Sequence, residues 1–169
     1  MDLIGAFLLV LGCVVLCQMA GFAGSVYTNR GLAWYRLLVK PRFTPSGRFI
    51  AIMWTALFTL MGISLFLVLR AGLEGDDIAV PVVVFGSQLF TNVYWNYVFF
   101  AANSPTYGLV AIATLLALIV LNIFVFWTVS PLAAILLLPY IAWVTVAAVL
   151  NGAVFVMNPK DRKERSPRR

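Results

Sequence analysis

Residues 104–159 read SPTYGLVAIATLLALIVLNIFVFWTVSPLAAILLLPYIAWVTVAAVLNGAVFVMNP, without one charged side chain, and the charge-free run already begins at residue 78. Residues 3–29 and 49–69 also carry no charge. A spanning helix needs about 20 apolar residues at about 1.5 Å rise per residue, so each block is long enough to cross a bilayer. The whole chain is 63% hydrophobic and 11% charged, whereas soluble domains carry about 25% charged residues. The sequence therefore predicts an integral membrane protein in the lipid bilayer.

Two turn signals divide the long charge-free block. Asn103-Ser104-Pro105 and Ser130-Pro131 each contain a proline, which suits a first helical turn and disfavours helix just before it. The prediction is an all-α bundle of five transmembrane helices in one domain, residues 1–159. Its spans are about 3–24, 48–70, 79–101, 107–128 and 131–156. Strands of a transmembrane barrel would alternate in polarity, and these runs do not.

Basic residues predict the orientation. Five lie between the first two spans and six in residues 160–169, whereas Arg70 alone lies on the other side. Because cytoplasmic loops carry the excess of Lys and Arg, we expect the N-terminus outside, and loop 25–47 and a basic tail, 160–169, in the cytoplasm. Gly21-Phe22-Ala23 mimics a signal-peptide cleavage site, but no basic residue precedes the first span, so we expect this span to be retained.

The missing residue types exclude several functions. The chain has no histidine, and its six carboxylates lie outside the spans or at their ends. Proton relays and ion-coupled transport usually place an ionisable group inside the membrane, and histidine is the commonest haem ligand and neutral-pH acid–base group. Cys13 and Cys17 match no metal pattern, so we expect small buried hydrophobes. No nucleotide-binding glycine pattern occurs either. We expect no metal site, no required cofactor and no nucleic-acid partner.

Aromatic and amide side chains gather toward the side of the membrane that holds the first loop. They lie on helical faces by the three-and-four spacing: Trp54 and Phe58; Asn92, Trp95, Asn96 and Phe99; Tyr140, Trp143, Ala147 and Leu150. Tryptophans near helix ends often form an interfacial belt, but Trp54 and Trp143 lie too deep for it. Helix packing and a cavity wall both remain open for them.

The first loop, residues 25–47, is amphipathic and aromatic. Such a long aromatic loop is typical of a lid or an interfacial segment rather than a spacer. Flat rings, a few amides and a lid together favour a large, flat, apolar ligand. The basic residues of the loop would then meet the carboxylates of that ligand at the water boundary.

Three stretches resemble the translocator protein family, the TspO and peripheral benzodiazepine receptor group also called tryptophan-rich sensory proteins. They are WYRLLVKPRFTPSGRFIAIMWTALFTLMGIS (34–64), QLFTNVYWNYVFF (88–100) and SPLAAILLLPYIAWVTVAAVLNGAVFVMNP (130–159). The first resembles the family's W-Y, K-P, W-x-P-P and W-T-x-L-Y series, the second Q-L-x-x-N-x-x-W. The third resembles S-x-x-A-x-x-L-x-P-Y-x-x-W-x-x-x-A-x-x-L-N. The first span matches only as a hydrophobic helix.

The resemblance implies a five-helix homodimer whose first loop closes over a pocket. Family members bind porphyrins and other tetrapyrroles, and in some lineages cholesterol, so the implied ligands are porphyrin or haem, with sterol as a further class. By motif position the ligand-binding residues are Tyr35, Trp54, Phe58, Trp95, Asn96, Phe99, Trp143 and Ala147. Pro139 would bend its helix, and Asn151 would tie helices together.

Three departures from the family pattern affect these expectations. Phe43 stands where many members have tryptophan, and Ser46 replaces a proline, so a looser lid is expected. The usual cholesterol motif needs a tyrosine and an arginine where this chain has Gly152 and Val156, which argues against sterol preference.

Three functions are compatible with the sequence. The first is a sensor, carrier or scavenger that binds tetrapyrroles. The second is a light-dependent, porphyrin-degrading enzyme in which Trp54 and Trp143 would be the catalytic residues, and the third is a scaffold without a ligand. Helical spans favour a bacterial cytoplasmic membrane, with a bacterial outer membrane or an organelle membrane as alternatives.

Overall fold

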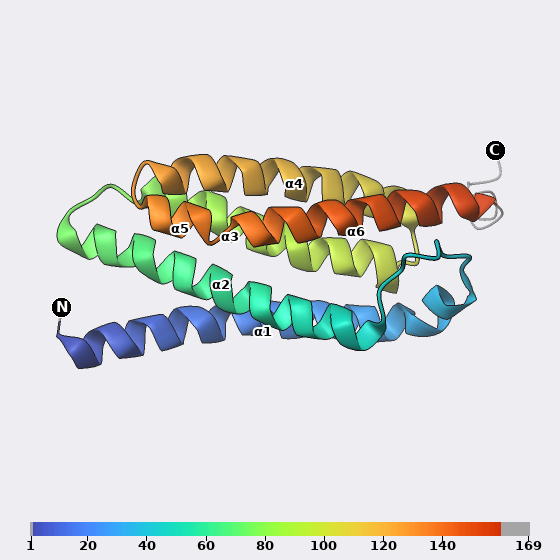
Figure 1. The fold of residues 1–169 in the computed structure, drawn as a ribbon, viewed down its shortest axis with the longest axis horizontal. Coiled ribbons are helices and arrows are strands. Elements are labelled where there is room, and N and C mark those ends of the chain that lie inside the picture. Colours follow the sequence, from blue (N-terminus) through green and yellow to red (C-terminus); the bar gives the residue numbers. More distant parts are fainter. Residues whose placement is uncertain (1, 160–169) are drawn as a thin grey trace.

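The structure is a computed structural model that describes residues 2–159, and the expected tail, 160–169, lies outside the described residues. The described chain forms seven helical elements along one long axis (Figure 1). They are α1 (Leu3–Leu37), α2 (Gly47–Glu74), α3 (Ala79–Asn96), η1 (Tyr97–Ala101), α4 (Pro105–Trp127), α5 (Pro131–Ile135) and α6 (Leu138–Met157). No strand occurs among residues 2–159. The predicted all-α class is confirmed.

Four segments are long and apolar enough to cross a membrane: α1, α2, α4 and the run Pro131–Met157 that contains α5 and α6. Helix α3 is the shortest of the long helices, with 18 residues, and it carries the amides of Gln88, Asn92 and Asn96. The structure thus describes a helical membrane protein with four candidate spans, and the fifth predicted span stays a prediction.

Helix α1 is much longer than its predicted span. It continues through residues 25–37, which the sequence analysis had assigned to the first loop, so that prediction was wrong and the connection to α2 is only residues 38–46. After Ser25 the composition changes to charged and aromatic residues, but no proline stops the helix before Pro41. Gly31 lies against η1 so closely that a Cβ would overlap the carbonyl of Phe100.

The chain turns between α5 and α6 inside the predicted last span. Helix α5 ends at Ile135, and α6 begins at Leu138 with Pro139 in its first turn. Proline has no N–H to continue the helical bonding, so a break before it is expected, as the resemblance implied. The hydroxyl of Ser64 on α2 donates to the Ala133 carbonyl at 2.7 Å and fixes the turn to the bundle.

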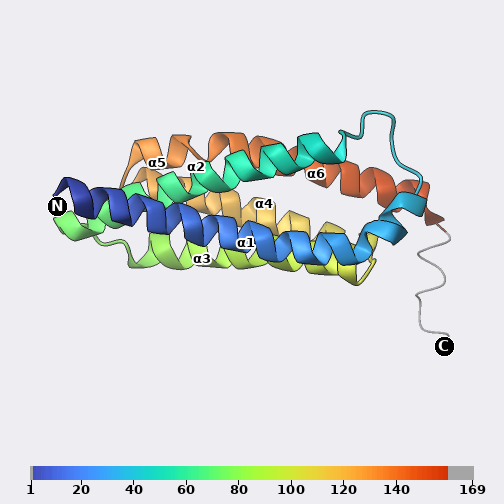
Figure 2. The same ribbon diagram turned by 90° about the horizontal axis from the view of Figure 1, so that it is seen from below.

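Both ends of the bundle are defined by short connections. The connection 38–46 lies at the same end as the last described residues of α6, and the N-terminus lies at the opposite end (Figures 1 and 2). We call the first of these the lid end. Near the other end, Phe85 of α3 stacks on Phe126 of α4 with ring centroids 5.7 Å apart. The core between the ends is apolar and tightly filled, with Met61, Leu115 and Ile119 fully buried.

Small residues let α1 and α2 approach each other. A Cβ on Gly62 would lie 2.5 Å from the Cα of Val14, and one on Gly21 would lie 2.6 Å from the ring of Phe58. Close helix contacts at small residues are common in membranes, where packing rather than water drives association. Large apolar side chains instead cover the outer surface, for example Phe7, which is 62% exposed, as expected for a bundle solvated by lipid.

Candidate functional site

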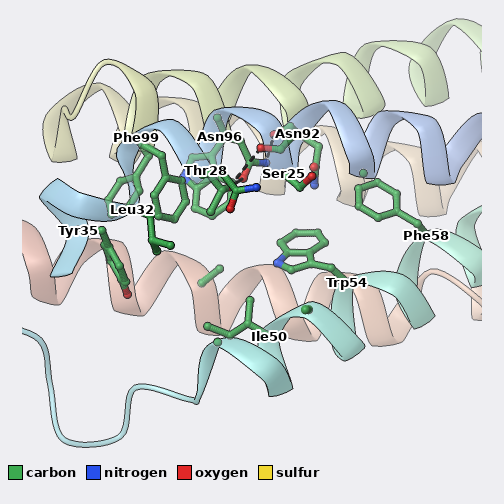
Figure 3. Close-up of a pocket in the computed structure, with 18 of the residues that line it drawn as sticks. Ser25, Thr28, Leu32, Tyr35, Ile50, Trp54, Phe58, Asn92, Asn96 and Phe99 are labelled. Atoms are coloured by element: carbon green, nitrogen blue, oxygen red, sulfur yellow. Dashed lines mark hydrogen bonds between the residues drawn. The ribbon is translucent and has the colours of Figure 1, made fainter.

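A cavity of about 650 Å³ lies at the lid end, between α1, α2, α3 with η1, and α6 (Figure 3). This volume is within the range of about 300–1,000 Å³ that is typical of small-molecule pockets. All eight residues expected at a ligand site line the cavity: Tyr35, Trp54, Phe58, Trp95, Asn96, Phe99, Trp143 and Ala147. The structure brings them together, and their contact with a ligand stays a proposal.

Aromatic rings form a connected wall around the cavity. Trp54 projects from α2 (Figure 3), and its ring centroid lies 5.7 Å from that of Phe58 and 6.4 Å from that of Trp95. Trp95 in turn stacks on Phe99 at 5.9 Å, and Tyr35 meets Phe99 edge-on at 6.1 Å. Rings from α1, α2, α3 and η1 thus make one continuous apolar surface.

Amide side chains hold this wall in place. The indole N–H of Trp95 donates to Oδ1 of Asn151 at 3.2 Å, and Nδ2 of Asn151 donates to the Pro105 carbonyl at 3.0 Å. Nδ2 of Asn92 donates to the hydroxyl of the buried Tyr140 at 3.0 Å. The expectation that Asn151 ties helices together is confirmed, because its side chain on α6 bonds both α3 and α4.

Helix α1 supplies a polar edge that the sequence analysis missed. Thr28 donates from Oγ1 to Oδ1 of Asn96 at 2.9 Å, and Gly24 leaves just enough room for the Asn96 side chain. Gln18, Ser25, Asn29 and Leu32 line the same side of the cavity. The signal was present in the sequence, since positions 18, 25, 29 and 32 follow helical spacing. Ending the first span at residue 24 concealed it.

Trp143 carries an unpaired donor. Its Nε1 is buried and has no hydrogen-bond partner among the described residues, and its ring meets Phe49 of α2 at 5.9 Å. A buried N–H without a partner costs about 1–3 kcal/mol. The nitrogen itself is not exposed to the cavity, so Trp143 contributes its ring rather than its N–H to the lining.

No charged side chain is found among the described residues that line the cavity. Among residues 2–159 no group of three His, Cys, Asp or Glu side chains is placed to hold a metal ion, and Cys13 and Cys17 lie buried in the core, as predicted. At the lid end the ammonium of Lys40 lies 4.9 Å from the centroid of the Tyr35 ring. The cavity offers stacking surfaces, a few hydrogen bonds and positive charge near its mouth.

The chain is similar in sequence to known proteins. The model of the TspO/MBR family matches residues 13–157. The tryptophan-rich protein TspO of Chlorobaculum tepidum is 41% identical over 148 residues, which cover 87% of this chain and 94% of the relative. The tryptophan-rich protein TspO of Archaeoglobus fulgidus is 36% identical over 139 residues, 82% and 89% of the two chains. The translocator protein of Sus scrofa is 31% identical over 159 residues, 93% and 94%.

Proposed function

The chain belongs to the TspO/MBR family, and from this premise we propose that it binds a porphyrin or related tetrapyrrole in the cavity at the lid end. One observation carries the proposal: a cavity of about 650 Å³ is walled by connected aromatic rings and lined, among the described residues, by no charged side chain. A large, flat, aromatic ligand gains the most binding free energy from such a wall, because each stacked ring contributes about 1–3 kcal/mol in sites where bases stack on aromatic side chains.

The polar groups of the site match the periphery of such a ligand. Inside, the amide of Asn29, which lines the cavity, would bond one polar group of the ligand. On the lid side, Arg42 in the connection 38–46 and Arg48 in the first turn of α2 are exposed and are suited to carboxylates that stay near water. An apolar macrocycle with acidic edges would therefore lie with its ring inside and its carboxylates toward the lid.

The residues present favour metal-free porphyrin over haem. The chain has no histidine, so haem would enter only without the usual axial ligand, and the proposal requires no cofactor. A sterol is also flat and apolar and is the second ligand class. Gly152 and Val156 replace the tyrosine and arginine of the usual cholesterol motif, and for this reason we propose porphyrin as the preferred ligand.

We also propose that α3 with η1 is the fifth membrane span. Together they cover Ala79–Ala101 without a charge and run beside α4 (Figure 1). The buried Gln88 and Asn92 lower the hydropathy of α3 but face the protein interior, where amides are tolerated. With five spans, the lid end and the tail both lie on the cytoplasmic side of a bacterial cytoplasmic membrane.

We also propose the homodimer that the resemblance implies. Light scattering of the solubilised protein would test it.

The test of ligand binding is a titration of the detergent-solubilised protein with protoporphyrin, followed by quenching of tryptophan fluorescence. We expect saturation at one porphyrin per chain. Empty micelles with free tryptophan are the control for partition of the porphyrin into detergent. Quenching that follows this control at every concentration would refute the proposal and favour a scaffold without a ligand.

A second candidate function is light-dependent degradation of the bound porphyrin. The supporting observation is that oxidisable rings are in contact: the ring centroid of Trp54 lies 6.4 Å from that of Trp95 and 6.3 Å from that of Tyr140. The excited porphyrin would supply the energy, and dioxygen would be the oxidant that takes up the electrons lost by the macrocycle. Trp54 and Trp143 would relay these electrons through transient oxidation and return to their starting state. Product analysis under illumination, with a dark control, separates this enzyme from a binding protein.

A further inference from the structure

The side chain of Asn158, just after the end of α6, forms two hydrogen bonds with the backbone of Val39. Oδ1 accepts from the Val39 N–H at 2.9 Å, and Nδ2 donates to the Val39 carbonyl at 3.0 Å. Nδ2 also donates to the Val154 carbonyl at 2.8 Å, which fixes the amide on its own helix. One amide therefore pairs with both backbone groups of a residue 119 positions away.

Val39 belongs to the connection 38–46 between α1 and α2, which we call the lid. On either side of Val39 the chain is also anchored. Leu38 is 7% exposed and belongs to the core, and Nζ of Lys40 donates to the carbonyls of Tyr35 and Leu38 at 2.8 and 3.0 Å. Beyond these residues the lid is held within itself by a turn in which Thr44 bonds the Pro41 carbonyl. Val39 is thus a point at which the lid is bonded to the end of α6.

The lid joins two walls of the cavity. Leu32 and Tyr35, near the end of α1, line the cavity, as do Gly47 and Ile50 at the start of α2. Figure 3 shows Tyr35 and Ile50 on the two helices that the lid connects. Movement of the lid away from α6 would therefore separate α1 and α2 at the mouth, whereas Asn158 itself is not part of the cavity lining.

We infer that Asn158 is a positioning residue that latches the lid to α6 and so controls how fast a ligand enters and leaves the cavity. The inference rests on the proposed ligand-binding function. Because Asn158 touches the lid and not the cavity, its loss changes the population of the open state without changing the contacts of the bound ligand. Entry and exit should then accelerate together, and the equilibrium affinity should change little.

The first test measures association and dissociation of protoporphyrin by stopped-flow fluorescence for the parent protein and for Asn158→Ala. Loss of two hydrogen bonds predicts that both rate constants rise by about tenfold, with Kd changed by less than about threefold. The matched control is Val156→Ala, in the last turn of α6 and 72% exposed, which should leave both rates unchanged. Unchanged rates in Asn158→Ala would overturn the inference. So would a rise in dissociation alone, because that result assigns Asn158 to the support of the pocket.

A second variant closes the latch instead of opening it. In Val39→Cys/Asn158→Cys a thiol stands on each of the two residues that are hydrogen-bonded in the parent protein, and the native Cys13 and Cys17 are buried in the core. With the disulfide confirmed by mass, we expect both rates to fall at least tenfold below the parent values. Addition of a reductant should return them to those of Asn158→Ala. If rates in the oxidised protein equal those in the reduced protein, the ligand does not pass the lid and the inference fails.

Failure of the latch and failure of the proposed function give different results. If the parent protein shows no saturable porphyrin binding, the proposed function fails. Hydrogen exchange at the Val39 amide in the ligand-free protein then tests whether Asn158 holds the lid, independently of ligand binding. Faster exchange in Asn158→Ala than in the parent supports the latch, and equal exchange at this amide overturns it.

Discussion

The indole N–H of Trp95 donates to Oδ1 of Asn151, 56 positions further along the chain, at 3.2 Å. Asn151 is 2% exposed, and its own amide donates to the carbonyl of Pro105. One buried side chain thus joins three helices and orients a ring of the cavity wall. Because Trp95 stacks on Phe99 and lies beside Trp54, the wall depends on this amide although the amide offers no aromatic surface.

Substitution Asn151→Ala is expected to destabilise the protein by about 1–3 kcal/mol. It removes two hydrogen bonds and leaves the Trp95 N–H and the Pro105 carbonyl unpaired in the core, and such bonds contribute about 0.6 kcal/mol on average in membrane helices, with unpaired groups costing more. Thermal unfolding followed by circular dichroism measures the effect. Asn29→Ala, at an exposed position of α1, is the control, and equal stability of the two variants would contradict the prediction.

Substitution of Trp54 or Trp143 by alanine is expected to weaken porphyrin binding by about 1–3 kcal/mol, the scale for loss of one stacking ring. Fluorescence titration with protoporphyrin measures the change. Trp127→Ala is the control, because Trp127 is 55% exposed at the far end of α4 and outside the cavity lining. Parent-like affinity in all three variants would place the ligand elsewhere.

Substitution Gly31→Ala should destabilise the protein by about 1–3 kcal/mol, the usual cost of overpacking. The added Cβ would overlap the carbonyl of Phe100 and push α1 away from η1. Gly12→Ala is the matched control on the same helix, since nothing lies within 4 Å of its Cβ position and alanine favours helix by about 1 kcal/mol. We expect opposite shifts in the unfolding temperature. A stable Gly31→Ala would mean that α1 and η1 do not pack this closely.

Cysteine labelling tests the orientation. In a protein with Cys13 and Cys17 replaced, Asp76→Cys should react with an impermeant maleimide from outside intact cells. Phe43 lies in the lid and is 59% exposed. A cysteine at this position, Phe43→Cys, should react only after the membrane is opened. The physical reason is the excess of basic residues at the lid end. The reverse labelling pattern would place the lid outside the cell.

Illumination tests the candidate enzyme activity. The chain has no histidine, and no carboxylate lines the cavity among residues 2–159, so a dark acid–base reaction has no evident catalyst. Any turnover of protoporphyrin should therefore need light and oxygen. The variant Trp54→Phe/Trp143→Phe keeps two rings that are harder to oxidise, so it should slow loss of absorbance more than it weakens binding. If the parent, the variant and empty detergent lose protoporphyrin equally fast, the protein is a binder.

The sequence alone determined the class of the protein and much of its site. Charge-free runs long enough to cross the apolar core of a membrane predict helices, regardless of which segments they pack against. The reason is that lipid offers no hydrogen bonds, so the backbone N–H and C=O groups of such a segment must bond each other. Helical spacing also grouped Asn96 with Phe99 and Trp54 with Phe58. Motif resemblance then assigned these residues and Trp143 to a ligand site, and the structure places them around one cavity.

The contribution of α1 was decided by the tertiary structure. In lipid the outside of a helix is as apolar as its packed side, so hydrophobic periodicity did not show that Gln18 and Thr28 face a cavity. Nor did a change in composition at residue 25 mark the end of the helix, because a chain can leave the apolar layer and remain helical. The pairings of Asn151 with Trp95 and of Asn158 with Val39 join residues 56 and 119 positions apart. Helical spacing in the sequence relates only residues a few positions apart. Packing of the whole bundle is needed to bring such distant groups within hydrogen-bonding distance.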